Sequence, residues 1–544
     1  MSAPSNSVRR LGPAINEPIR AYAPGSPERA ELKARLRAMD KECPEIPLVI
    51  GGKEIHTGDV TNAVSPHKHG HVTATWHHAR TKDVIAAVAA AKKAQREWAS
   101  WRWEDRATVL LRAADLLATT WRSKLAAATM LGQSKTVYQA EIDATCELID
   151  FWRFNVQFAG EIYAEQPVSS PGMSNHIDYR GLEGFVYAVS PFNFTAIGGN
   201  LPTAAALMGC TVIWKPAGTA ILSAWHTMQL LQEAGMPPGV INFVPGNAKA
   251  ISDVLLPHHD LAGVHFTGST AVFNSMWDTI GRNIGSYRSY PRIVGETGGK
   301  DFIVAHPSAD PAAIAVAIVR GGFEYQGQKC SAASRVYVPK SLWKEVRDRV
   351  VAMVEEIRMG DPADFRNFMG AVIDQKAFDK ISEYLKDAKK NAKVICGGGA
   401  NGKTGWFIEP TLVQTDDPSY RLMCEEIFGP VVTAHVYDDA KWTETLKIVD
   451  ATSPYALTGA VFARDRSAVA EAQVALRNAA GNFYINDKPT GAVVGQQPFG
   501  GARGSGTNDK AGSKLNLVRW VSARTVKETF VPATNYQYPS MEVE

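Results

Sequence analysis

Residues 184–215 read GFVYAVSPFNFTAIGGNLPTAAALMGCTVIWK and decide the fold. Two short apolar runs, at 185–189 and 211–214, flank a stretch of helical length at 196–208. Short apolar runs separated by helices are typical of parallel strands that are covered on both faces. This stretch therefore predicts a strand, a helix and a second, parallel strand.

The same alternation continues to about residue 295. Further apolar runs lie at 240–244 and 262–266, and helical stretches at 220–234, 248–256 and 271–284. The pattern predicts a doubly wound sheet, which binds its ligand beyond the carboxyl ends of its strands. Ser190, Lys215 and Gly268 lie just after three of these runs, so we expect them near the ligand.

The rest of the chain predicts a second α/β unit and two extended ends. The second unit has helices at 310–323, 342–358 and 381–391, strands at 335–338 and 393–396, and further alternation to about residue 486. An extended arm to about residue 47 carries one helix at 27–40, and helices are expected within 81–131 and at 139–160. Residues 521–538 alternate in part, which predicts a strand that joins another subunit.

The composition is that of a folded enzyme for small molecules. The 544 residues include 58 Lys and Arg against 55 Asp and Glu, a net charge of +3, with 45% hydrophobic and 21% charged residues. A near-neutral chain does not suggest the basic stripe of a nucleic-acid binder. No uninterrupted run of about 20 apolar residues predicts a membrane span. We therefore expect a small-molecule substrate, and neither a nucleic acid nor a membrane as partner.

The six cysteines contain no CxxC pair, which argues against a disulfide scaffold and for a reducing compartment. Residues 1–10 lack the apolar core of a secretory signal, so the sequence favours a cytoplasmic location. Cys330 stands apart, because small residues surround it and Lys329 precedes it, which would favour an accessible thiolate. Taken alone, this pattern fits a reactive thiol and a structural cysteine equally well.

Two polar residues each have a functional and an ordinary interpretation. Glu296, in VGETGGK at 294–300, is either a general base in a domain cleft or a solvated turn residue. Asn193, in SPFNF at 190–194, either donates to an oxyanion or caps the following helix. The segment FTGST at 266–270 ends a strand and opens a helix, which is a suitable place for a pyrophosphate.

Two other patterns do not predict ligand sites. Gly397, Gly399 and Gly402 form a G-x-G-x-x-G, but another Gly and a Pro follow within 403–410, which predicts a loop turn rather than the helix of a dinucleotide site. Five histidines fall between residues 67 and 78 with no nearby cysteine, so no metal site is expected.

Taken together, these segments resemble the aldehyde dehydrogenases. Residues 190–194, 214–216, 266–269 and 295–300, the region around Cys330, and EEIFGP at 425–430 come in the order found in that family, and the resemblance covers about residues 50–527. Within the family the chain resembles the 1-pyrroline-5-carboxylate dehydrogenases, also called glutamate-γ-semialdehyde dehydrogenases. GETGGK at 295–300, QKCS at 328–331 and GQQPFGG at 495–501 carry this narrower resemblance.

The resemblance implies NAD-dependent oxidation of L-glutamate γ-semialdehyde to L-glutamate in proline degradation, after the ring form opens without an enzyme. Cys330 would attack the aldehyde carbon to give a thiohemiacetal, and Asn193 with the backbone N–H of Cys330 would hold the oxyanion. After hydride transfer, Glu296 would activate the water that hydrolyses the thioester.

The resemblance also implies binding residues. The cofactor residues would be Ser190, Lys215, Gly268, Ser269, Thr270, Ala271, Val272 and Glu426. The substrate residues would be Ser331, Gly491 and Ala492 at the carboxylate, Glu147 at the ammonium group, and Phe194 and Phe499 beside the aliphatic chain. Gly218 stands where many relatives carry an acid that binds the adenine ribose, which weakens the argument for NAD over NADP.

The implied subunit has a Rossmann-type cofactor domain, an α/β catalytic domain and a small β flap for homo-oligomerisation. The expected division is an arm at 1–45, the cofactor domain at 46–295 with flap segment 174–183, the catalytic domain at 296–486, and a return and tail at 487–544.

A separate proline dehydrogenase is expected as functional partner, because the chain has no room for a flavin domain. Alternatives are a dehydrogenase for another acidic aldehyde, such as succinate semialdehyde, and a non-enzymatic protein on the same fold.

Overall fold

Strand β7 (Phe185–Val189) lies inside a seven-stranded sheet in the computed structural model, which describes residues 12–543. The strand order is β11-β10-β7-β8-β9-β2-β3. Strands β7 to β11 run parallel, and β2 and β3 join antiparallel at one edge. The other strands are β8 (Thr211–Lys215), β9 (Ile241–Phe243), β10 (Leu261–Thr267), β11 (Arg292–Glu296), β2 (Leu48–Ile50) and β3 (Lys53–Ile55).

Both faces of this sheet are buried, which explains the unbroken apolar runs of the sequence. Val186 and Ala188 of β7 pack into one core, and Phe185, Tyr187 and Val189 pack into the core on the opposite face. The helices of the first core are α3 (Trp103–Ala118), α4 (Arg122–Gln133), α6 (Leu148–Ala164), α7 (Thr195–Leu207) and α8 (Ile221–Glu233). Those of the second are α2 (Thr81–Ser100), α9 (Ala248–Leu255) and α10 (Thr270–Arg282).

The sheet reverses its winding between β7 and β10. The chain passes from β7 outward through β8 and β9, and then returns to place β10 and β11 on the other side of β7. In a doubly wound sheet such a reversal opens a crevice at the carboxyl ends of the two strands. Residues that follow β7 and β10 therefore border this crevice, as the sequence predicted.

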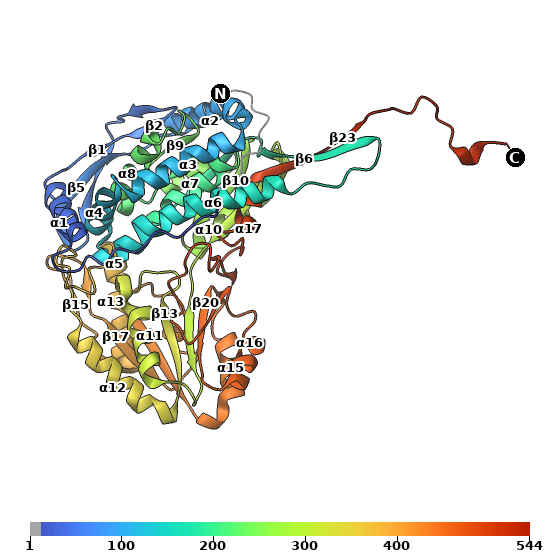
Figure 1. The fold of residues 1–544 in the computed structure, drawn as a ribbon. Coiled ribbons are helices and arrows are strands. Elements are labelled where there is room, and N and C mark those ends of the chain that lie inside the picture. The colour runs from blue at the N-terminus through green and yellow to red at the C-terminus, as the bar shows by residue number, and fades with distance from the viewer. Residues whose placement is uncertain (1–11, 544) are drawn as a thin grey trace.

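A second seven-stranded sheet forms the lower body in Figure 1. Its strand order is β14-β17-β18-β13-β12-β20-β21, and all neighbours are parallel except β14. The strands are β12 (Asp301–Ala305), β13 (Ala333–Pro339), β14 (Lys393–Cys396), β17 (Thr411–Thr415), β18 (Val431–Tyr437), β20 (Thr458–Phe462) and β21 (Asn482–Ile485). The helices are α11 (Pro311–Phe323), α12 (Lys340–Glu356), α13 (Gln375–Asn391), α14 (Arg421–Cys424), α15 (Trp442–Ala451) and α16 (Arg466–Ala475).

One predicted helix differs from the observed backbone. The stretch expected as a single helix at 139–160 is α5 (Val137–Ala140), a π-helical segment (Glu141–Glu147) and then α6. The wider turn changes which side chains face the interior, and π-helical segments are common at functional sites. Glu147 is the last residue of this segment, directly before α6.

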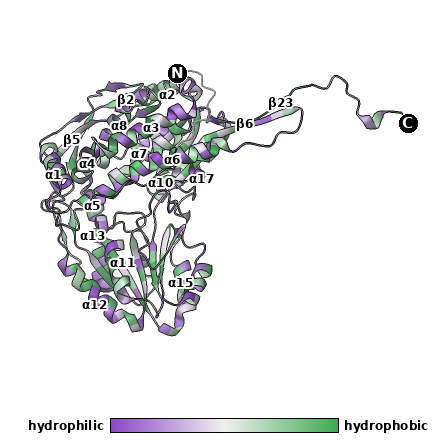
Figure 2. Cartoon of the chain, in the orientation of Figure 1, coloured by the Kyte–Doolittle hydropathy of each residue, from purple (hydrophilic) through white to green (hydrophobic). Residues whose placement is uncertain are grey.

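The C-terminal strand pairs within its own chain. Strand β23 (Val521–Thr529) runs antiparallel to β6 (Met173–Gly181), and the two project from the upper body as a long ribbon (Figure 1). Both hydrophilic and hydrophobic residues lie along this projection (Figure 2). Beyond the ribbon, residues 530–543 carry exposed Phe530, Val531, Tyr536 and Tyr538.

The smaller elements complete the surface. A three-stranded sheet is formed by β1 (Glu45–Ile46), β5 (Lys68–His77) and β4 (Val60–Ser65). The two-stranded pairs are β15 (Ala400–Asn401) with β16 (Phe407–Ile408) and β19 (Tyr455–Ala456) with β22 (Ala502–Arg503), and α17 (Lys514–Leu517) precedes β23. No helix among residues 12–543 has the length and apolarity to cross a bilayer.

The predicted N-terminal arm is described from Gly12 onward, because residues 1–11 lie outside the described residues. Its helix is α1 (Pro27–Met39), which Ser26 caps by accepting the backbone N–H of Arg29. The residues before α1 run along α6 and α4, far from the arm in sequence. The arm is therefore packed against the upper body, and residues 14–17 contact helix α6.

Candidate functional site

Four predicted site residues meet at the carboxyl edge of the upper sheet. Ser190 follows β7, Lys215 ends β8, Gly268 follows β10 and Glu296 ends β11. Because these strands are parallel, their carboxyl ends share one edge. The backbone N–H of Gly268 donates to the carbonyl of Glu296 over 3.1 Å, which fixes the two ends together. The sequence predicted this edge for Ser190, Lys215 and Gly268, and the structure adds Glu296 to it.

The N-terminus of α10 lies where the sequence predicted an anion site. Ser269 is its N-cap and accepts the backbone N–H of Val272 through its hydroxyl, 3.4 Å away. Thr270 and Ala271 open the helix, and free amides and the helix dipole at such a position favour phosphate oxygens. A Cβ on Gly268 would lie 2.7 Å from the ring of Phe266, so only glycine fits this turn.

Two charged residues border the same crevice. Burial lowers the pKa of Lys215 to about 8, and no acid forms an ion pair with it among residues 12–543. Glu426 accepts the backbone N–H of Gly299 over 3.1 Å, and burial raises its pKa. An unpaired lysine and a buried carboxylate beside an anion site suit the hydroxyls and phosphates of a dinucleotide, so the residues present fit such a cofactor.

Cys330 lies on a strained loop between the two bodies. Tyr325 and Gln326 have left-handed backbone angles (φ 50° and 55°), and the Gln326 amide donates to the carbonyl of Ala371 over 2.7 Å. Backbone strain of this kind persists only where surrounding contacts enforce it, and it clusters at active sites. The loop holds Cys330 with 8% of its surface exposed.

The predicted effect of Lys329 on Cys330 is wrong. The Lys329 ammonium group donates to Glu324 over 3.0 Å, and both side chains are buried. The pKa of Cys330 is raised well above its usual value by burial, and then by the nearby carboxylates of Glu296 and Asp301. The resting cysteine is therefore a buried thiol rather than an accessible thiolate, and it needs a base before it can attack.

Asn193 does not act as a helix cap. The N-cap of α7 is Phe194, and the free amides of Thr195 and Ala196 donate instead to Asp143, over 3.0 and 2.9 Å. The Asn193 amide group donates to the carbonyl of Gln328 over 3.1 Å, two residues from Cys330. Its donor is thus directed at the cysteine loop, where an oxyanion hole requires it.

Glu296 is not a solvated turn residue. Its Oε1 atom is shielded from solvent and has no hydrogen-bond partner among residues 12–543. Burial raises its pKa to about 8, and the charge of Lys510 opposes that rise. Glu296 and Lys510 line one cavity of about 40 Å³, enough for about two or three water molecules. A carboxyl group with a free oxygen beside such a cavity can activate water.

The predicted substrate residues come from segments that are far apart in the sequence. Ser331 follows Cys330, and its hydroxyl lies 2.8 Å from that of Thr490, next to Gly491 and Ala492. Glu147 and Phe499 line the same cavity as Glu296. Burial, and then the Asp143 carboxylate, raise the pKa of Glu147 well above its usual value. Phe194 is half-buried at the start of α7.

Several contributors were missed from the sequence. Lys135 is fully buried, pairs with Asp143 over 2.6 Å, and lies 4.1 Å from the centre of the Phe194 ring. Asp143 caps α7 and so holds the start of the helix that follows Asn193. Thr490 and Lys510 likewise face the site from segments that carry no recognisable motif. A buried lysine is unusual enough that its partner is worth seeking, but the sequence does not show which residue that is.

The two patterns set aside in the sequence have ordinary structures. Gly397 and Gly398 form a turn between β14 and β15, with φ of 74° and 90°, so no helix follows the G-x-G-x-x-G, as predicted.

Among the described residues, Glu45, His56 and His77 bring three potential metal ligands together. Gly58 N–H donates to Nδ1 of His77, which places the ring proton on Nε2, directed at Glu45. A hydrogen-bonded cluster fits this geometry better than a metal site.

Comparison with known proteins gives close matches over almost the whole chain. A crystal structure of the delta-pyrroline-5-carboxylate dehydrogenase of Mycobacterium tuberculosis bound with NAD is 55% identical, with a TM-score of 0.96, and the match covers 99% of this chain and 100% of that one. The delta-1-pyrroline-5-carboxylate dehydrogenase of Dictyostelium discoideum is 52% identical over 97% of this chain and 95% of its own. Both names agree with the narrower resemblance drawn from the sequence.

A longer protein contains a similar unit. Proline utilization A of Bdellovibrio bacteriovorus is 30% identical with a TM-score of 0.91, and the match covers 97% of this chain but 54% of that protein. The present chain therefore corresponds to about half of that larger one.

The comparisons also correct one expectation. The sequence favoured a cytoplasmic location, whereas the relative from Dictyostelium discoideum is named as mitochondrial. The cytoplasmic assignment is therefore wrong. The assignment rested on residues 1–10, which lack an apolar signal core and lie outside the described residues.

The family itself is settled by one further match. The sequence profile described as "Aldehyde dehydrogenase family" matches residues 55–526, which include the parallel strands of the upper sheet, the whole second sheet, the cysteine loop and most of the ribbon. The predicted α/β fold, with its doubly wound cofactor-binding body and its second α/β body, is confirmed. The chain belongs to the aldehyde dehydrogenase family.

Proposed function

We propose that this chain is an L-glutamate γ-semialdehyde dehydrogenase, which uses NAD to oxidise the opened form of 1-pyrroline-5-carboxylate to L-glutamate. One observation carries the proposal: Asn193 is directed at the loop of Cys330, and Glu296 keeps a free oxygen beside the same site. A nucleophile, an oxyanion donor and a base are the three groups that aldehyde oxidation through a thioester requires. The names of the relatives in Mycobacterium and Dictyostelium support the substrate.

The reaction begins with activation of the thiol. Because burial raises the pKa of Cys330, a base must take its proton, and the nearby carboxylate of Glu296 would act as that base. The thiolate sulfur then forms a bond to the aldehyde carbon, and the carbonyl π electrons move to oxygen. Asn193, with the backbone N–H of Cys330, donates to that oxyanion, and one such donor typically contributes about 3–4 kcal/mol to lowering the barrier.

When bound, NAD would supply the acceptor for the hydrogen of the aldehyde carbon and its electron pair. Ser190, Lys215, Ser269, Thr270, Ala271, Val272 and Glu426 are the residues that would hold it. Loss of that hydrogen leaves a thioester on Cys330. Glu296 first releases the thiol proton to solvent and then takes a proton from water in the adjacent cavity, so that the resulting hydroxide attacks the thioester carbon. The C–S bond breaks, the carboxylic acid leaves, and the departing thiolate takes the proton back from Glu296 to re-form the thiol.

Substrate selection follows from the charges at the remote end of the molecule. Ser331 and the backbone amides of Gly491 and Ala492 would take the α-carboxylate. Glu147 would pair with the ammonium group, whose arrival stabilises the ionised carboxylate that burial otherwise disfavours. Phe194 and Phe499 would flank the aliphatic chain.

Trp76 explains why Gly218 carries no side chain, and the choice of NAD over NADP rests on the relatives. A Cβ at this position would lie 2.8 Å from the ring of Trp76, so the tryptophan occupies the space of the side chain that many relatives carry here. The bound NAD of the Mycobacterium structure supports the same cofactor. Binding of NAD and NADP measured by calorimetry separates the two.

The flap and the exposed tail support a homo-oligomer. The β6–β23 ribbon projects from the body and ends in a tail with several exposed aromatic residues (Figure 1). Large exposed apolar surfaces usually mark an interaction site. We retain the division into arm 1–45, cofactor domain 46–295, catalytic domain 296–486 and return 487–544, and light scattering of the full chain tests the assembly.

A separate proline dehydrogenase would supply the substrate. Oxidation of proline gives 1-pyrroline-5-carboxylate, and the longer proline utilization A protein matches this chain over about half of its length. The function is tested by NADH formation from 1-pyrroline-5-carboxylate, with succinate semialdehyde as competing substrate.

A further inference from the structure

The N-terminal arm links two walls of the substrate site through Asn16. The Asn16 side-chain amide donates to Asp150 of α6 and to the carbonyl of Val494, each over 2.8 Å. Its oxygen accepts a hydrogen bond from the Gln496 side chain over 3.0 Å. One half-buried side chain therefore joins helix α6 to segment 494–496.

Both partners lead directly to predicted substrate residues. Asp150 lies three residues, about one helical turn, after Glu147. Val494 lies two residues after Ala492. Segment 494–496 also approaches α6 closely, because a Cβ on Gly495 would lie 2.2 Å from the ring of Phe154. The helix and the segment are thus neighbouring walls, and Asn16 supplies polar contacts between them.

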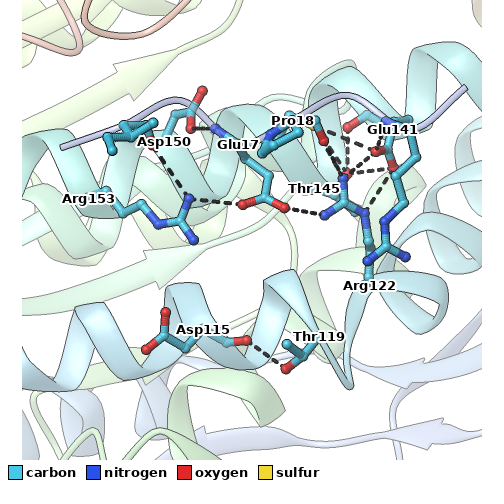
Figure 3. Close-up of polar contacts among 12 residues, drawn as sticks. Glu17, Pro18, Asp115, Thr119, Arg122, Glu141, Thr145, Asp150 and Arg153 are labelled. Carbon is cyan, nitrogen blue, oxygen red and sulfur yellow. Dashed lines mark hydrogen bonds and ion pairs between the residues drawn. The ribbon is translucent and has the colours of Figure 1, made fainter.

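The arm itself is fixed by charged groups directly after Asn16. Glu17 donates its backbone N–H to Asp150 over 2.7 Å, and its carboxylate accepts from Arg153 over 2.9 Å and from Arg122 over 2.5 Å. Figure 3 shows Glu17 between these two guanidinium groups. Arg122 is buried and also donates to the carbonyl of Pro18 over 3.0 Å. Hydrogen bonds to ionised groups are stronger than neutral ones, so the arm holds Asn16 in a defined place.

We propose that Asn16 is a positioning residue for substrate recognition, which keeps the segment of Gly491 and Ala492 in register with the helix that follows Glu147. The inference rests on the proposed function. Glutamate semialdehyde carries its carboxylate and ammonium groups on one carbon, so the two walls must keep a fixed spacing to bind both groups together. Binding groups lose much of their effect when they shift by a fraction of an ångström.

The test compares variants of the full-length chain. In Asn16→Ala, we expect KM for glutamate semialdehyde to rise about tenfold, which corresponds to about 1.4 kcal/mol. KM for NAD, and kcat/KM for propanal, an aldehyde without charged groups, stay unchanged. Tyr22→Phe is the matched control, because it removes another contact of the arm, the 2.8 Å bond to Glu141, away from segment 494–496.

A second variant tests the link from its other side. Gln496→Ala removes one of the three side-chain contacts of Asn16, so KM for glutamate semialdehyde should rise less than in Asn16→Ala. In the double variant, KM should rise by less than the product of the two single fold-increases, because Asn16→Ala and Gln496→Ala remove the same hydrogen bond. Thermal unfolding of each variant shows whether the chain stays folded.

Three outcomes overturn the inference. An unchanged KM in Asn16→Ala excludes a role in recognition, and an equal loss with propanal, or in Tyr22→Phe, shows that the arm acts only on general stability. Failure of the unsubstituted chain to oxidise glutamate semialdehyde or to bind glutamate overturns the proposed function, and the inference with it. That failure is seen before any variant is compared, so the two cases are distinct.

Discussion

The hydroxyl oxygens of Ser331 and Thr490 lie 2.8 Å apart. This contact joins the residue after Cys330 to the residue before Gly491, although they are far apart in sequence. The ammonium group of Lys488 donates to the carbonyl of Thr490 over 2.8 Å and holds the second loop. The nucleophile loop and the predicted carboxylate site are therefore tied together, which fixes the distance from the reacting carbon to the remote end of the substrate.

Replacing the two hydroxyl groups separately tests this link. Ser331→Ala removes a predicted donor to the substrate carboxylate, where a hydrogen bond to a charged group contributes about 1.5–3 kcal/mol. We expect KM for glutamate semialdehyde to rise about tenfold or more, from the same energy scale. Thr490→Val leaves Ser331 in place and should cost less, near 1 kcal/mol. Steady-state kinetics measure both, and a larger loss in Thr490→Val would contradict the assignment of Ser331.

Asp143 is expected to stabilise the fold as well as the site. Asp143→Ala leaves Lys135 buried without its partner and removes the acceptor for two amides of α7. Breaking one partner of a buried pair typically costs about 3–5 kcal/mol, so the thermal unfolding midpoint should fall clearly. The double variant Asp143→Leu, Lys135→Met removes both charges and should recover part of the loss. A midpoint unchanged in Asp143→Ala would refute this role.

The hydrolysis step should depend on pH through Glu296. Burial raises the pKa of this carboxyl group to about 8, and only its ionised form acts as a base. The rate of thioester hydrolysis should therefore fall as the pH drops through about 8. Lys510→Met removes a positive charge that lowers this pKa, so the fall should begin at a higher pH. Lys510→Arg keeps the charge and serves as control, and a shift to lower pH in Lys510→Met would be the wrong sign.

Much of the fold was predictable because its signals are local. The apolar run at 185–189 became β7 with its predicted bounds, since a strand buried on both faces needs such a run. The π-helical segment at Glu141–Glu147 was not predicted, because side-chain periodicity does not show which carbonyl each amide selects. The pairing of β23 with β6 links segments about 350 residues apart, and tertiary contacts of that range have no local signature.

The sequence indicated which residues to examine for the site, but not the protonation state of the cysteine. Cys330, Glu296 and Asn193 were singled out, yet the expected thiolate was wrong, because Lys329 pairs with Glu324. That pair depends on the strained loop between the two residues, which brings the Lys329 side chain back to Glu324. Lys329 is adjacent to Cys330 in the sequence, but its charge is paired elsewhere, and only the folded structure shows that partner.

Replacing the nucleophile separates chemistry from binding. Cys330→Ala should abolish NADH formation, because no other residue is proposed to form the thioester. NAD binding, measured by calorimetry, should remain, since the predicted cofactor contacts lie on the ends of β7, β8 and β10, on α10 and at Glu426 rather than at Cys330. Turnover that persists in this variant would exclude Cys330 as nucleophile.

The central claim is tested most directly by NADH formation in a panel of aldehydes with the full-length chain. With NAD, glutamate semialdehyde supplied as 1-pyrroline-5-carboxylate should give the highest kcat/KM, above succinate semialdehyde and above the same substrate with NADP. A higher kcat/KM for succinate semialdehyde would contradict the account of substrate recognition by Ser331, Gly491, Ala492 and Glu147.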